Sequence, residues 1–112
     1  MVDGQSMALD GQRHSLLLVQ FNSSIASRTF LDYETPAAAM DGVCLLYEKE
    51  LQFLNPKVPN MTYDISDLYN YIDQLEDLSL LIYQESMHGY VPRNKDWMKK
   101  QLHSHLRGQA GS

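Results

Sequence analysis

The sequence has a single cysteine, Cys44, so no intramolecular disulfide can form. A chain of 112 residues can bury enough surface to fold without one. It also lacks an apolar run approaching the roughly 20 residues that cross a bilayer. Residues 1–15 lack the basic start and apolar stretch of a signal peptide. We therefore expect a single-domain protein of a reducing intracellular compartment, the nucleus or the cytoplasm or both, with no membrane association.

Positive charge is scarce as well. The formal net charge of -5 argues against a domain whose role is to bind RNA or DNA without sequence preference. The charge is unevenly distributed, because residues 62–90 contain acidic residues but neither lysine nor arginine, whereas the charged residues of 93–107 are basic except Asp96. Two solvated helix faces, one acidic and one basic, would explain this pattern. The alternative is that these charges select binding partners electrostatically.

Motifs that carry catalysis or bind cofactors are missing too. There is no P-loop, no glycine-rich dinucleotide turn and no zinc-ligand spacing among the four histidines. Cys44 falls on an apolar helix stripe, where a packed thiol is expected. The carboxylates of Asp73, Glu76 and Asp77 are expected to form a solvated acidic face. The sequence therefore predicts no catalytic, metal-binding or cofactor-binding residues, and a protein that is not an enzyme.

Three segments carry the start signals of helices. Thr35 can cap the free N–H groups of a first helix, the proline after it suits the first helical position, and a proline after Asn55 ends the helix. Asp64 can cap a second helix and Asn94 a third. Apolar residues recur at spacings of three and four, and in the first helix this stripe comprises Met40, Val43, Cys44, Tyr47, Leu51 and Leu54.

Strands are expected at residues 14–21, 28–33 and 78–84. A fourth strand begins at 90–91, and we expect it to be short or at an edge of the sheet because Pro92 has no N–H to donate to a neighbouring strand. The order ββααββα indicates an α+β fold in which three helices cover one face of a four-stranded antiparallel sheet. The domain spans 14–107, and we expect a disordered N-terminal arm over 1–13 and a disordered tail over 108–112.

The first and third strands are apolar on both faces. Successive side chains of a strand point to opposite faces, so a sheet with one solvated face should alternate apolar and polar residues. We assign Leu16, Leu18, Leu81 and Tyr83 to the face that the helices leave uncovered. Such a patch is rare on a monomer, so we expect a homodimer that pairs sheet to sheet through these four residues. The alternative is that the N-terminal arm or the last helix folds under the sheet.

Three further side chains lie off the expected core stripes. Leu46 and Phe53 are seven residues apart and share one line on the first helix, away from its buried face, and Tyr71 is off the stripe of the second helix. We predict that all three contact a partner protein. For Leu46 and Phe53, the alternative is that a neighbouring helix or the second copy covers them. For Tyr71, the alternative is an exposed tyrosine without a contact role.

Several short motifs together resemble the enhancer-of-rudimentary family. The resemblance covers residues 14–107 in one register. None of the motifs encodes chemistry, but the set is specific. It comprises Arg28-Thr29-Phe30, Asp32-Tyr33-Glu34, Met40-Asp41-Gly42-Val43-Cys44, Tyr47-Glu48, Thr62-Tyr63-Asp64-Ile65-Ser66, Ile72-Asp73, Asp77-Leu78-Ser79 and Asn94-Lys95-Asp96-Trp97.

The resemblance implies the same α+β fold and a homodimer through the sheets. It also implies a non-enzymatic adaptor that binds short segments of RNA-processing proteins and scaffolds their complexes. These include complexes that process messenger RNAs and small-RNA precursors, and piRNA precursors in perinuclear germ granules. A domain that binds RNA directly, or a regulator of a pyrimidine-synthesis enzyme, is the alternative.

The chain also departs from the family pattern. It carries the N-terminal arm and extra loop residues around Ser24. Leu45 and Phe53 stand at positions where charged residues are expected, and Arg93 stands where an aromatic residue is usual. These differences indicate a divergent paralogue, and they affect the identity of the partner more than the fold.

Overall fold

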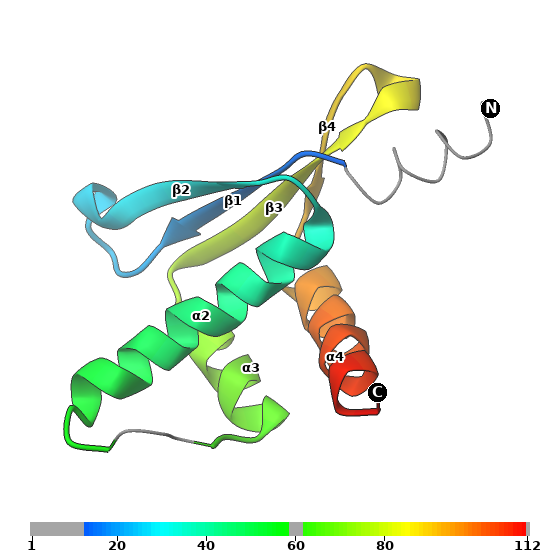
Figure 1. Ribbon diagram of the computed structural model, residues 1–112. Coiled ribbons are helices and arrows are strands. Elements are labelled where there is room, and N and C mark those ends of the chain that lie inside the picture. Colours follow the sequence, from blue (N-terminus) through cyan, green and yellow to red (C-terminus); the bar gives the residue numbers. More distant parts are fainter. Residues whose placement is uncertain (1–12, 59–61, 112) are drawn as a thin grey trace.

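A computed structural model describes residues 13–58 and 62–111, and it shows an α+β fold. Four antiparallel strands form one sheet in the order β2-β1-β3-β4. The strands are β1 (Ser15–Gln20), β2 (Arg28–Tyr33), β3 (Asp77–Gln84) and β4 (Gly89–Arg93). All three helices, α2 (Pro36–Leu54), α3 (Ile65–Gln74) and α4 (Lys95–Gly111), lie on the same side of this sheet (Figure 1). The expected fold class and element order are confirmed.

The helices begin at the residues whose side chains can cap them. The Thr35 hydroxyl accepts the N–H of Ala38 at 3.0 Å at the start of α2, and Asp64 forms a capping box with Asp67 at the start of α3. The side-chain oxygen of Asn94 accepts the N–H of Trp97 at 2.9 Å at the start of α4. The caps therefore place the three helix starts as the sequence predicts.

The core lies between the helices and one face of the sheet. The central strands β1 and β3 contribute alternate side chains, and the helices contribute the stripes that face them. Burial of each such side chain stabilises the fold by roughly 1.5–3 kcal/mol. The buried apolar side chains include Leu17, Val19, Leu78, Leu80 and Ile82 of the sheet and Met40, Val43, Leu68, Ile72, Met98 and Leu102 of the helices.

The C-terminal half of α2 angles away from the sheet (Figure 1). The predicted apolar stripe of this helix is therefore buried only in its first half, at Met40, Val43 and Cys44. Leu54 is 61% exposed, so its expected place in the core is wrong, because this end of the helix angles away from the sheet.

Other boundaries differ by one or a few residues. β1 is shorter than the expected 14–21, and β3 begins one residue earlier than expected. Short 3-10 turns fill the loops at Ile25–Ser27 and Glu85–Met87. α4 continues through the expected tail to Gly111, because one internal glycine costs a helix only about 1 kcal/mol relative to alanine. The N-terminal arm, apart from residue 13, lies outside the described residues, as does Ser112.

Candidate functional site

The face of the sheet opposite the helices carries a set of neighbouring apolar side chains, and we call it the open face. The strand register places Phe30, Leu18 and Ser79 in one cross-strand row. The next row contains Leu16, Leu81 and Pro92, with Asp32 at its β2 end, and a third pairs Tyr83 with Tyr90. Residues that are directly opposite on adjacent strands share a face.

All four residues that the sequence assigns to the uncovered side lie on the open face. Leu16, Leu18, Leu81 and Tyr83 are partly buried, and none of the helices α2, α3 and α4 lies on this side of the sheet. The strand β2 adds Phe30 to this face, because the register places Phe30 beside Leu18, and its side chain is 66% exposed.

Polar groups border the apolar centre of the open face. At one end, Nδ1 of His14 lies 2.6 Å from the Tyr90 hydroxyl, and Nε2 of the same ring contacts the carboxylate of Asp32. At the other end, Nε of Arg28 donates to the side-chain oxygen of Gln20 at 2.8 Å. An apolar centre with a polar border is the usual composition of a protein–protein interface.

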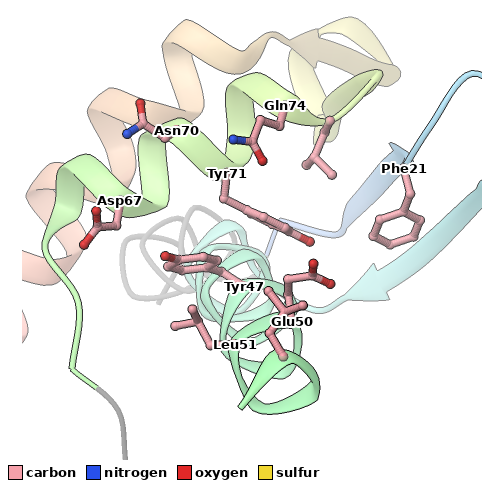
Figure 2. A pocket seen from close by; sticks show the side chains of 10 residues that line it. Phe21, Tyr47, Glu50, Leu51, Asp67, Asn70, Tyr71 and Gln74 are labelled. Atoms are coloured by element: carbon pink, nitrogen blue, oxygen red, sulfur yellow. The ribbon is translucent and has the colours of Figure 1, made fainter.

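A second candidate site lies between α2 and α3, and we call it the α2–α3 pocket. It is a cavity of about 420 Å³. Phe21, which directly follows β1, closes one side of it (Figure 2). Its lining residues are Phe21, Tyr47, Glu50, Leu51, Leu54, Asp67, Asn70, Tyr71, Gln74 and Leu75.

Stacked tyrosines form the aromatic wall of the α2–α3 pocket. The ring of Tyr47 lies 5.0 Å from that of Tyr71, with 34° between the ring planes, and it meets the ring of Tyr63 edge-on at 4.9 Å. The Tyr63 hydroxyl donates to Glu48 at 2.8 Å, which holds that ring in place. Figure 2 shows the Tyr71 ring reaching from α3 toward α2, with Glu50 and Phe21 at its hydroxyl end.

Two carboxylates stand beside these rings. Burial raises the pKa of Tyr47, and the negative charge of Asp67 raises it further. Burial likewise raises the pKa of Tyr71, with a further contribution from Glu50. Each tyrosine is therefore neutral at physiological pH, and the field of a nearby carboxylate reaches it.

The residues predicted to contact a partner are not brought together. Tyr71 enters the α2–α3 pocket, where the partly buried ring packs on Tyr47 instead of pointing away from the core. Leu46 packs against the core and Phe53 is 79% exposed, and neither lines that pocket. Leu46 is therefore only partly accessible to a partner, whereas Phe53 is accessible.

Sequence analysis missed most of the α2–α3 pocket. Tyr47 was assigned only to the core stripe, and the roles of Phe21, Glu50 and Asp67 depend on how α2 crosses α3. The sequence gives only a weak signal for this pocket, namely one tyrosine and one acidic residue on each of two consecutive helices.

Some titratable residues elsewhere have local partners. The acidic and basic helix faces meet in part, because Lys99 Nζ lies 2.5 Å from Asp73 and Lys95 Nζ donates to the Leu75 carbonyl at 2.7 Å. Burial raises the pKa of the Cys44 thiol to about 11. Among residues 13–58 and 62–111, no three His, Cys, Asp or Glu side chains gather as a metal ion would require. In the same part of the chain, no helix has the length and apolar character to span a membrane.

Comparison with known proteins identifies one family. The enhancer of rudimentary family matches residues 11–112 of this chain. The chain is 46% identical to an enhancer of rudimentary homolog of Arabidopsis thaliana over 98 residues, which are 88% of this chain and 90% of that protein. It is 46% identical to the protein enhancer of rudimentary of Drosophila virilis, over 88% of this chain and 95% of that one. It is 39% identical to the enhancer of rudimentary homolog of Caenorhabditis elegans, over 80% of this chain and 87% of that protein.

Proposed function

This chain belongs to the enhancer-of-rudimentary family, and on that premise we propose that it is a non-enzymatic homodimeric adaptor. It binds short segments of partner proteins and assembles them into RNA-processing complexes, including complexes that act on messenger RNA and on small-RNA precursors. Germline piRNA precursors, in perinuclear germ granules, are one such setting.

The observation that carries this proposal is the open face of the sheet. All three helices pack on the opposite side, so nothing in the described part of the chain covers Leu16, Leu18, Leu81 or Phe30. Contiguous apolar patches of this kind mark interaction sites on soluble proteins.

A second copy of the chain is the occupant that fits the open face best. A two-fold contact brings the same patch together from both copies, so one interface covers both patches. Each large apolar side chain that this contact buries contributes roughly 1.5–3 kcal/mol. The polar border of His14, Asp32, Gln20 and Arg28 can remain at the rim of such an interface, in contact with water.

An adaptor role follows from two-fold symmetry. A dimer presents every other surface of the chain twice, and two weak contacts to a dimeric or repeated partner combine into a tighter one. The Phe53 side chain, 79% exposed near the end of α2, is available for such a contact.

Direct RNA binding is supported less well. The open face carries aromatic residues, but the dimer uses that face, and the net charge of the chain is -5. Two lysines of the basic helix α4 are already occupied by Asp73 and the Leu75 carbonyl. Stacking of bases on a sheet normally requires basic residues around the aromatic ones.

Affinity purification of the full chain from its native cells tests the adaptor role. We expect RNA-processing proteins in the eluate, and a reduced set of them with a Leu16→Glu/Leu18→Glu variant that cannot dimerise. Recovery of a biosynthetic enzyme as the main partner, retained by both forms, would favour the alternative regulator of pyrimidine synthesis.

A further inference from the structure

The walls of the α2–α3 pocket are aromatic and acidic at once. Tyr47, Tyr71 and Phe21 supply ring surfaces, and Glu50 and Asp67 supply carboxylates from two different helices. Leu51, Leu54 and Leu75 complete the apolar part of the lining. The cavity, about 420 Å³, is large enough for one long side chain.

The charge in this pocket has one sign. None of its ten lining residues is lysine, arginine or histidine. Within residues 13–58 and 62–111, Glu50 forms no ion pair, and the Asp67 carboxylate accepts one hydrogen bond, from the backbone N–H of Asp64. Figure 2 shows the Glu50 carboxylate beside the hydroxyl end of Tyr71. Asp67 lies on the opposite side of the pocket in this view, and its charge contributes to the raised pKa of Tyr47.

Aromatic faces and carboxylates in one cavity are complementary to an organic cation. The face of a tyrosine ring attracts a guanidinium or ammonium group within about 6 Å of its centre. A carboxylate adds a charge-assisted hydrogen bond, and apolar residues pack on the methylene stem of a lysine or arginine side chain. We propose that the α2–α3 pocket receives one basic side chain, lysine or arginine, from a partner protein segment.

The chemistry of the pocket disfavours other occupants. A phosphate or an acidic peptide would be repelled by Glu50 and Asp67. A purely apolar side chain would leave the negative charges of both carboxylates unmatched, and a basic side chain would pair with them.

The pocket remains accessible in the dimer that we propose. It lies between helices, and the open face lies on the other side of the sheet (Figure 1). Each copy would therefore present one such pocket. The inference rests on the proposed adaptor role only in taking the ligand to be a segment of a partner protein.

A titration of the full-length chain, followed by the backbone amide signals in NMR, tests this inference. The probes are arginine and lysine with blocked termini, and blocked citrulline, which has nearly the shape of arginine but no charge. We expect arginine or lysine to shift the signals of residues 47–51 and 67–75, with citrulline having no effect at the same concentration. The shifts should weaken in 1 M salt, where the Debye length falls to about 3 Å.

Matched variants locate the binding. Glu50→Gln should weaken binding of the cation by roughly two- to fivefold, the range for one exposed ion pair. Glu34→Gln changes the net charge equally but lies outside the pocket lining, and it should leave the affinity unchanged. Tyr71→Leu should weaken binding by a similar factor through loss of the ring face.

The inference is wrong if citrulline shifts the same signals equally, if neither cation shifts them at millimolar concentration, or if Glu50→Gln and Glu34→Gln bind alike. These outcomes leave the dimer and its co-purified partners untouched, so they are distinct from failure of the adaptor role. Conversely, binding of arginine or lysine at Glu50 would stand even if the purified partners proved unrelated to RNA.

Discussion

Leu18 of β1 and Phe30 of β2 are direct cross-strand neighbours on the face of the sheet opposite α2, α3 and α4. Leu18 is partly buried, whereas Phe30 is 66% exposed. Leu16 and Leu81 form the neighbouring pair across β1 and β3. An edge strand and two central strands thus present one continuous apolar surface, and our account of the protein depends on what covers it.

Charges at the centre of this surface should separate the two copies. In Leu16→Glu/Leu18→Glu, pairing of the open faces would bury four carboxylates against apolar side chains, which is strongly unfavourable. We expect a monomer or an insoluble protein in light scattering. Phe53→Glu places a charge at an exposed apolar residue near the end of α2 and should keep the dimer mass. An unchanged mass for the double variant would reject the assignment of Leu16 and Leu18 to the interface.

Gly42 is required by the close approach of α2 to β2. A Cβ atom at this position would lie 2.1 Å from the Tyr33 hydroxyl oxygen and 2.4 Å from the ring carbon that bears it. Gly42→Ala should destabilise the fold by about 1 kcal/mol or more, although alanine favours a helix by about that amount. Urea unfolding measures the loss. Tyr33→Leu should lower the free energy of unfolding less in the Gly42→Ala background than in the original chain. Equal losses in the two backgrounds would show that the two residues do not compete for space.

The buried thiol of Cys44 should be unreactive in the folded protein. Burial raises its pKa to about 11, so little of the reactive thiolate exists at pH 8. We expect slow labelling by a thiol reagent at pH 8 in buffer and rapid labelling in denaturing urea. Fast labelling of the folded chain would mean that α2 does not pack as described.

The same shift makes stability depend on pH. The unfolded thiol titrates near its ordinary value of 9.0 and the folded thiol near 11, so the unfolded chain releases the proton first. This contribution to stability is complete below pH 9 and is lost as the pH rises toward 11. The urea midpoint of unfolding should be lower at pH 10 than at pH 8, and Cys44→Ala should reduce this difference. Part of the difference between the two midpoints should remain in Cys44→Ala, because the pKa values of Tyr47 and Tyr71 are also raised in the folded chain.

The chain should not bind RNA on its own at physiological salt. Its net charge is -5, and Lys95 and Lys99 of α4 make contacts within the fold. A filter-binding assay with single-stranded RNA should show no retention at about 0.15 M salt. Tight binding whose affinity falls steeply with added salt would instead favour an RNA-binding domain.

Local signals were sufficient to predict the elements of this fold. Thr35, Asp64 and Asn94 cap the helices as their side-chain chemistry requires, and Pro92 lies in an edge strand because it lacks an N–H. Alternation along β1 and β3 was enough to separate Leu17 from Leu16 and Leu18, since strand periodicity is fixed at two.

Features set by contacts between elements could not be predicted in the same way. The face of Phe30 became clear only from its pairing with Leu18. Tyr71 appears off its stripe on an isolated helix, and it packs inward because α2 crosses α3 at Tyr47. The end of α2 angles away from the sheet, so Leu54 fits an apolar repeat but remains exposed.

The mass of the full-length chain in solution tests the central claim most directly. Sedimentation equilibrium at micromolar concentration should give twice the chain mass of 12.9 kDa. A single species of 12.9 kDa, with the open face protected by the chain itself, would contradict the homodimer and the two-fold adaptor that depends on it.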